Sequence, residues 1–353
     1  MKRDKTKKES FFLKNLSPLN KRRIANFKAN KRSLWSLRIL LILFVISLFA
    51  EFFANNKPII IFYNNNLYFP VFSSISETTF DGEFESEADY RDPYVQNLIK
   101  KNGWMLWPII RFSFNTVNKS LPVPAPSPPT LENWLGTDDN GRDIVAQMLY
   151  GLRISLLFGF LLTLLSPIIG IAVGALQGYL GGKIDLFFMR ILEVYSSLPS
   201  LFILIIITSI FPPNFWLLLF FFLIFGWTSF VGIVRAEFLR ARNFDYVRAA
   251  RALGIGHRTI MFRHIFPNAM SSTLTYIPFI LNGSIASLAT LDFLGFGLPP
   301  TDPSLGRLIL QAKINLHAPW IGFSIFVFLG FLFSLLIFIG EGVRDAFDPK
   351  KLV

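Results

Sequence analysis

Residues 236–267, AEFLRARNFDYVRAARALGIGHRTIMFRHIFP, form a strongly basic stretch between two long apolar segments. The carboxylates in it are Glu237 and Asp245, against seven arginines within it or beside it: Arg235, Arg240, Arg242, Arg248, Arg251, Arg258 and Arg263. The hydrocarbon core of a bilayer does not accept such an excess of charge, and cytoplasmic loops of membrane proteins are rich in Lys and Arg. We therefore expect this stretch to lie at the cytoplasmic membrane surface.

The centre of the stretch predicts a short helix. Asp245 is expected to cap its N-terminus through the carboxylate, and Gly254 is expected to end it. The small residues Ala249, Ala250 and Ala252 would let a partner approach the backbone closely while the flanking arginines contact acidic groups. A solvated basic loop that only fixes the topology is the alternative.

The composition is that of an integral membrane protein. Of 353 residues, 52% are apolar, 16% aromatic and only 16% charged. The net charge of +12 is concentrated in residues 1–33, which contain twelve Lys or Arg against Asp4 and Glu9. Next to an apolar segment, such a tail indicates topology and contact with membrane lipid, and not nucleic-acid binding. Cysteine is absent, so thiolate metal sites and disulfides are excluded.

Six apolar segments are long enough to cross about 30 Å of hydrocarbon. They lie at 34–54, 154–178, 191–211, 215–234, 270–291 and 319–340. We expect an all-α integral membrane protein with six transmembrane helices and both termini in the cytoplasm. The first segment exceeds the apolar region of a signal peptide and is expected to be a retained anchor. The predicted order is a basic tail 1–33, helix 34–54, an extracytoplasmic insert 55–150, a core 151–343 with five helices, and a tail 344–353.

The expected insert, 55–150, has seven basic and eleven acidic residues, a charge balance opposite to that of the tail. The run Asn64-Asn65-Asn66 lies among aromatic and aliphatic residues and predicts a hairpin. Trp104 and Trp107 suit either the membrane interface or a small folded core. Prolines at 122, 124, 126, 128 and 129 exclude a helix and favour an extended linker.

Within the spans, Gly170, Gly174 and Gly178 recur every four residues and predict a smooth face for close helix packing. Arg190 and Glu193 are spaced for an ion pair near the cytoplasmic interface. Three further residues are candidates for local unwinding of spans near a solute path: Pro199, Pro278 and Gly283.

Three motifs resemble those of bacterial ABC importer permeases. Arg248-Ala249-Ala250, Gly254 and Pro267 have the spacing of the "EAA" signature, with Arg248 in place of the family's glutamate. The sequence LGTDDNGRD at 135–143 is similar to the LGTDxxGRD motif of the dipeptide and oligopeptide branch, although capping of the following helix by 138–140 also accounts for it. The sequence TLDFLGFG at 290–297 resembles a third segment of that branch.

The resemblance implies a type I importer permease fold in the bacterial inner membrane, in a permease subunit for peptides or peptide-like compounds of the oligopeptide and microcin C type. It implies a second permease subunit, two ATP-binding cassette domains and an extracytoplasmic solute-binding protein as partners. ATP would be used by the partner, so this chain would bind no cofactor. The coupling helix that docks on the ATPase would include seven residues of the loop 236–267: Asp245, Arg248, Ala249, Ala250, Arg251, Gly254 and Pro267.

Motifs for chemistry are missing from the chain. No G-x-x-x-x-G-K-[ST], H-E-x-x-H or G-x-S-x-G sequence occurs, so we expect no enzymatic activity of this polypeptide alone. Two other classes of protein predict different features. A secondary transporter or channel predicts inverted repeats and buried titratable relays, which are not evident. A membrane-anchored scaffold whose active part is 55–150 would leave the basic loop without a partner.

Overall fold

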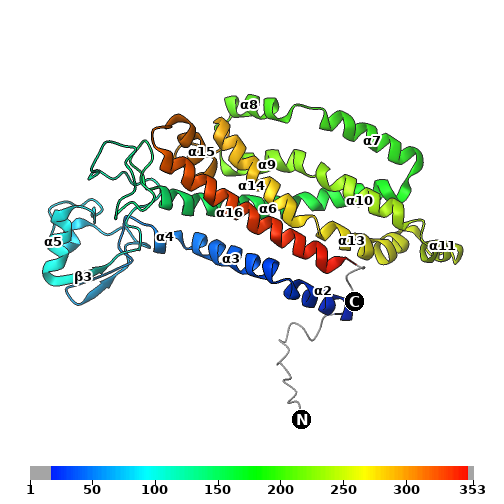
Figure 1. Ribbon diagram of the computed structural model, residues 1–353, viewed down its shortest axis with the longest axis horizontal. Helices are drawn as coiled ribbons and strands as arrows, with labels where there is room; N and C mark the ends of the chain where they lie inside the picture. Colours follow the sequence, from blue (N-terminus) through cyan, green and yellow to red (C-terminus); the bar gives the residue numbers. More distant parts are fainter. Residues whose placement is uncertain (1–16, 349–353) are drawn as a thin grey trace, which may run out of the picture.

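The computed structural model describes residues 17–348. Long helices lie roughly parallel, with a folded insert at one end of the bundle and helix α11 at the other (Figure 1). The outermost parts of the two predicted tails, 1–16 and 349–353, lie outside the described residues.

The N-terminal part is helical from Pro18 onward. It contains α2 (Pro18–Ala29), α3 (Lys31–Leu48) and α4 (Ala50–Phe53). Part of the expected basic tail is thus a helix, which Ser17 caps by accepting a hydrogen bond from the Asn20 backbone N–H. Helices α3 and α4 together cover the predicted first span, 34–54, and the break between them is at Phe49.

The core begins at Ile144, earlier than the expected boundary at 151, and its last helix extends to Phe347, into the expected C-terminal tail. Its helices are α6 (Ile144–Leu180), α7 (Gly182–Ser196), α8 (Ser200–Ile210), α9 (Phe215–Gly226), α10 (Thr228–Ala241), α11 (Asp245–Ala252), α12 (His257–Thr259), the π-helix η2 (Ile260–Ile265), α13 (Phe266–Leu274), α14 (Ile277–Leu294), α15 (Leu305–Ile314) and α16 (Pro319–Phe347). At about 1.5 Å per residue, the 37 residues of α6 extend about 55 Å.

Four helical stretches of the described chain are long and apolar enough to cross a membrane. They are α6 (Ile144–Leu180), α9 and α10 taken together (Phe215–Ala241), α14 (Ile277–Leu294) and α16 (Pro319–Phe347). The helices α7 and α8 make a fifth candidate if they are taken as one span, bent by 58°. Helix α3, which contains Lys31, Arg32 and Arg38, is not among these candidates. The structure therefore supports a multi-pass membrane protein with four or five candidate spans.

The insert corrects the expectation of an all-α chain. It contains a three-stranded antiparallel sheet in the order β2 (Asn66–Tyr68), β1 (Ile60–Tyr63), β3 (Gly103–Leu106). The predicted hairpin is present and consists of β1 and β2. Its two-residue turn is Asn64-Asn65, and both residues have the positive φ that such a tight turn requires. The 3₁₀ helix η1 (Glu77–Phe80) and helix α5 (Pro93–Asn102) complete the insert.

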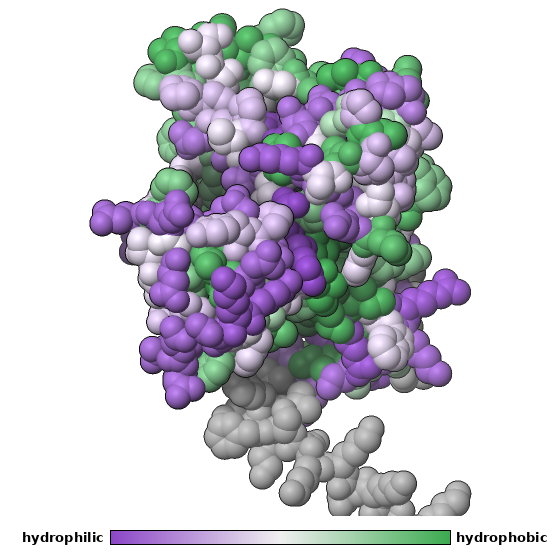
Figure 2. All heavy atoms as spheres, turned by 90° about the vertical axis from the view of Figure 1, so that its left-hand side faces the viewer, coloured by the Kyte–Doolittle hydropathy of each residue, from purple (hydrophilic) through white to green (hydrophobic). Residues whose placement is uncertain are grey.

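A small hydrophobic core makes the insert a folded unit. The side chains of Tyr63, Phe80, Tyr90 and Ile99 are almost fully buried in it. Trp107 packs against this core, whereas the side chain of Trp104 is 51% exposed. Seen from the insert's end of the molecule, hydrophilic residues dominate the near surface, and the upper edge is hydrophobic (Figure 2).

Helix α6 is the centre of the core, with α3, α9, α10, α14 and α15 packed along it. Pro167 lies inside α6 and cannot donate a hydrogen bond to the carbonyl one turn back. Pro199 lies at the bend between α7 and α8, where local unwinding was expected. The predicted span 270–291 is interrupted between α13 and α14, and Pro278 lies directly after this break in the first turn of α14, as expected. Gly283 lies within α14 without interrupting it, so the expectation of unwinding is wrong for that residue.

Candidate functional site

The basic loop 236–267 folds around the eight-residue helix α11, Asp245–Ala252. Phe244 is the N-cap residue and makes no side-chain cap bond, and Asp245 is the first helical residue. The expectation that Asp245 caps the helix by a hydrogen bond is therefore wrong. Its carboxylate still lies in the first turn, where negative charge is favourable next to the helix N-terminus.

Gly254 ends α11, as the sequence predicts. Its φ of +74° is a left-handed conformation that glycine adopts without strain. The Gly254 N–H donates to the carbonyl of Arg251, and the Ile255 N–H donates to that of Ala250 at 3.1 Å. This pair of bonds is a Schellman C-cap, which satisfies the last carbonyls of the helix.

Helix α11 has an inner and an outer face. Val247 and Ala250 are buried in one cluster with Ile260 and Ile265 of η2. The expectation that Ala250 contacts the ATPase directly is thus corrected, because its side chain faces this chain's own core. Leu253 lies outside that cluster, and its side chain is 80% exposed.

The other loop residues selected from the sequence lie at the surface: Asp245, Arg248, Ala249, Arg251 and Pro267. Pro267 is the second residue of α13, and the turn directly before α13 is widened into the π-helix η2. A proline cannot donate to the carbonyl one turn back, and a π-turn accommodates a helix whose bonding pattern is interrupted. The loop thus continues into α13 without a break.

The loop is joined to the end of α6 by contacts that the sequence analysis missed. The Tyr179 hydroxyl hydrogen-bonds Nδ1 of His257 at 2.8 Å. The guanidinium of Arg251 lies over the same tyrosine ring, 5.6 Å from its centre. Because Tyr179 is in the last turn of α6, a displacement of α11 or α12 reaches α6 directly.

An ion pair between α7 and α10 was also missed. Arg235 donates from Nε and Nη2 to the two carboxylate oxygens of Asp185, at 2.6 and 2.7 Å. Gln177 of α6 donates to the Asp185 backbone carbonyl at 3.2 Å. The ion pair that the sequence predicts, Arg190–Glu193, forms at 2.6 Å but is exposed to solvent. Asp185–Arg235 is the better-buried pair, and it holds α7 against the core.

The three glycines of α6 lie against the backbone of α10. A Cβ added at Gly170 would lie 2.4 Å from the carbonyl oxygen of Trp227. At Gly174 and Gly178 the corresponding distances, to the oxygens of Val231 and Arg235, are 2.8 and 2.6 Å. Only glycine allows this approach, so α6 and α10 pack as one unit beside the basic loop.

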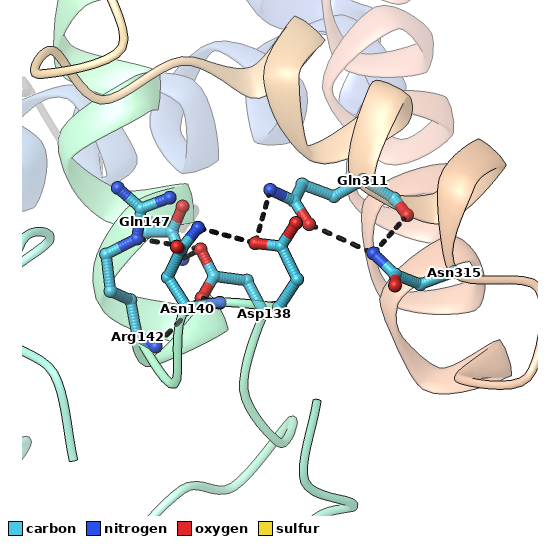
Figure 3. Close-up of polar contacts among 7 residues, drawn as sticks. Asp138, Asn140, Arg142, Gln147, Gln311 and Asn315 are labelled. Carbon is cyan, nitrogen blue, oxygen red and sulfur yellow. Dashed lines mark hydrogen bonds and ion pairs between the residues drawn. The ribbon is translucent and has the colours of Figure 1, made fainter. Parts of the chain in front are cut away.

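At the opposite end of α6, the motif LGTDDNGRD folds into a cluster of hydrogen-bonded polar side chains, the Asp138 cluster (Figure 3). The buried carboxylate of Asp138 accepts hydrogen bonds from the backbone N–H groups of Asn140 and Arg142, from Nε of Arg142 and from Nε2 of Gln147. Gln311 of α15 donates to the carboxylate of Asp139 at 2.8 Å. The motif therefore ties the linker to α6 and α15.

The N-cap of α6 is Asp143, so the expectation that residues 138–140 cap this helix is wrong. The Asp143 carboxylate accepts from the Ala146 N–H and from the Asn133 side chain, both at 2.8 Å. Burial raises the pKa of the Asp143 carboxyl above its usual range, although these two hydrogen bonds favour the ionised form. The last residue of the motif thus caps the helix, and Asp138 instead holds the preceding turn.

The third motif forms the C-terminal end of α14. Asp292 is buried, and its carboxylate accepts from the Leu298 N–H at 2.7 Å and from the Ser304 hydroxyl at 2.5 Å. Gly295 has a φ of +83° and ends the helix. Asp292 therefore shapes the turn that leads to α15, which Ser304 caps through a hydrogen bond from the Arg307 N–H.

The chain is thus a bundle of candidate spans with a basic loop at one end and a folded insert at the other, and comparison with known proteins identifies its class. Residues 170–353 match the family described as "Binding-protein-dependent transport system inner membrane component". The chain belongs to this family. It is therefore the membrane component of a transport system, and not an enzyme with its own ATP-binding motif.

Curated relatives match most of the chain. It is 55% identical over 338 residues to the inner membrane ABC transporter permease protein YejE of Escherichia coli (strain K12), covering 96% of this chain and 99% of the relative. It is 53% identical to the peptidoglycan transport system permease protein YejE of Agrobacterium fabrum, covering 95% and 94%. The oligopeptide transport system permease protein OppC of Bacillus subtilis is 33% identical, covering 68% and 78%.

Proposed function

We propose that the chain is one of two permease subunits of an ATP-driven importer for peptides or peptide-like compounds, the class that includes microcin C. Two relatives named YejE and one named OppC support this, since their names specify ABC, peptidoglycan and oligopeptide transport. In this proposal a solute-binding protein delivers the solute, a separate ATPase binds and hydrolyses ATP, and this chain binds no cofactor.

The observation that carries the proposed coupling role is the outer surface of the basic loop. Leu253, directly after α11, is 80% exposed there, close in sequence to the exposed arginines Arg248 and Arg251. Large apolar side chains on a charged surface outside the spans favour a protein partner. Helix α11 is thus the proposed ATPase contact, and Tyr179 and the glycines of α6 would transmit its movement into the bundle.

The proposed topology has six spans, with α3–α4 as the first in addition to the four or five candidates; α3 runs alongside the long helices in Figure 1. Helix α2, the end of α16 and α11 lie toward one end of the bundle, and the insert lies at the other. The basic tail and loop favour the cytoplasm for the first end, which places both termini there and the insert outside. A cytoplasm-active reporter fused at Gly256 should give signal, and one at Asn102 should be silent.

The surfaces left for the other partners follow from this topology. Helices α7 and α8 expose Leu186, Val194, Phe202 and Ile210, each more than 60% accessible, which favours contact with lipid and the second permease. On the insert, a polar cavity of about 470 Å³ is lined in part by Arg91, Arg111, Trp107 and Trp134. This cavity is the proposed contact surface for the solute-binding protein.

The test compares two equally exposed leucines at opposite ends of the molecule. Leu253 is 80% exposed on the basic loop, and Leu316, between α15 and α16, is 82% exposed. Leu253→Glu should lose both co-purification of the ATPase and peptide uptake while inserting normally, because a carboxylate desolvated in the interface without a partner costs several kcal/mol. Leu316→Glu should keep the ATPase. Wild-type ATPase binding and uptake by Leu253→Glu would show that α11 is not the docking helix.

A further inference from the structure

A groove of about 700 Å³ lies between the N-terminal helix α2 and helices α3, α13 and α16. Its walls are mostly apolar, with side chains from α2, α3 and α16: Ile24, Phe27, Leu34, Leu37, Ile339 and Val343. Helix α16 is a candidate span, and the part of it that lines the groove, 339–347, is the end of that span. The cavity is thus open to a hydrocarbon occupant and not only to water.

The rim of the groove is cationic. Arg23 and Lys28 of α2 line it, and no Asp or Glu is among the described residues that do so. The Arg23 guanidinium donates to the Ser271 hydroxyl at 2.9 Å and lies 4.3 Å from the centre of the Phe347 ring. Both contacts are with neutral groups, and they hold the guanidinium at the mouth of the groove without neutralising its charge.

An apolar trough with two cations at one end has the polarity of an anionic phospholipid. The acyl chain matches the walls, and the phosphate matches the rim. A water-soluble acidic peptide would match Arg23 and Lys28 but leave the apolar walls of α3 and α16 uncovered. A purely apolar helix would cover the walls but leave the two cations without a partner. The charge and the apolar walls together therefore favour lipid.

We propose that this groove binds one anionic glycerophospholipid from the leaflet on the α2 side, with its phosphate group against Arg23 and Lys28. The lipid would bridge α2 and α16 to α13, whose Pro267 and Met270 also line the groove. Because α13 continues directly from the basic loop, the lipid would brace the base of that loop. This binding does not depend on which solute is transported.

The test uses the purified full complex in nanodiscs that contain phosphatidylglycerol or phosphatidylcholine with the same photoactivatable acyl chain. Labelling should fall on Pro267–Leu274 and on Ile339–Phe347, with phosphatidylglycerol preferred by on the order of tenfold, as expected for two cations at a membrane surface. Equal labelling by the two lipids, or labelling spread evenly over all lipid-facing helices, would overturn the proposal.

Two variants separate the groove from general surface charge. Arg23→Ala combined with Lys28→Ala should abolish the preference for phosphatidylglycerol. The matched control, Lys31→Ala with Arg32→Ala, removes the same charge from a neighbouring groove and should preserve it. Met270→Trp fills the apolar groove without changing charge and should suppress labelling by both lipids there. If the Lys31/Arg32 control lost the preference for phosphatidylglycerol as fully as the Arg23/Lys28 variant, the preference would depend only on the general charge of the tail, and the site would be refuted.

Discussion

Replacement of Gly178 by alanine should force α6 away from α10. A Cβ at this position would lie 2.6 Å from the backbone oxygen of Arg235 and 2.7 Å from the Cβ of Phe238. Nonbonded carbon atoms pack best at about 3.5–4.0 Å. Neither neighbour is the end of a flexible side chain, so the clash is relieved only by moving a helix.

The magnitude follows from two opposing effects. Overpacking of this kind costs about 1–3 kcal/mol. Alanine is a better helix former than glycine, which returns at most about 1 kcal/mol. Overpacking therefore equals or exceeds the gain, and Gly178→Ala should be less stable than the natural chain by up to about 2 kcal/mol and less stable than a glycine-to-alanine change in open space by about 1–3 kcal/mol. Each kcal/mol corresponds to a fall in Tm of roughly 2–4 °C.

The assay is thermal unfolding of the purified complex, with peptide uptake measured in parallel. Gly232→Ala is the matched control, because Gly232 is on α10 and a Cβ there meets nothing within 4 Å. This control should unfold at or slightly above the natural temperature and transport normally. The reasoning fails if Gly178→Ala unfolds at the same temperature as Gly232→Ala, since the close approach of α6 and α10 would then have no energetic weight.

Tyr179→Phe removes the hydroxyl bond from α6 to the basic loop and should lower uptake while leaving ATPase binding intact; unchanged uptake would argue against transmission through α6. Asp138→Ala leaves the Arg142 guanidinium without its ion-pair partner and should destabilise the Asp138 cluster by about 3–5 kcal/mol. The expected result is faster proteolysis within 118–143. Lys57 lowers the pKa of Glu87, so their pair stabilises the insert above the usual glutamate pKa and is lost as pH falls through the lowered value. Glu87→Gln should remove that part of the acid-unfolding profile.

Local features were the ones that the sequence predicted well. The end of α11 at Gly254 and the turn at Asn64-Asn65 depend on residues that tolerate positive φ, and the pair Arg190–Glu193 depends on spacing within one helix. Each is decided by neighbours in the chain, so the sequence contains the whole signal.

Features decided by packing were missed or reversed. The inner position of Ala250 depends on η2, which covers the apolar face that Ala250 shares with Val247 on an otherwise polar helix. Asp185 and Arg235 are 50 residues apart, and Tyr179 and His257 are 78 apart.

Helix α6 is fastened at both ends, and Pro167 lies between the fastenings. On one side of the proline, Gly170 to Gly178 lock the helix onto α10 and the basic loop. On the other side, Asp138 and Asp143 hold its start to the linker. Bending costs least where the backbone already lacks a hydrogen bond. A bend at Pro167 would therefore let the second half of α6 move with the basic loop while the first half stays with the insert.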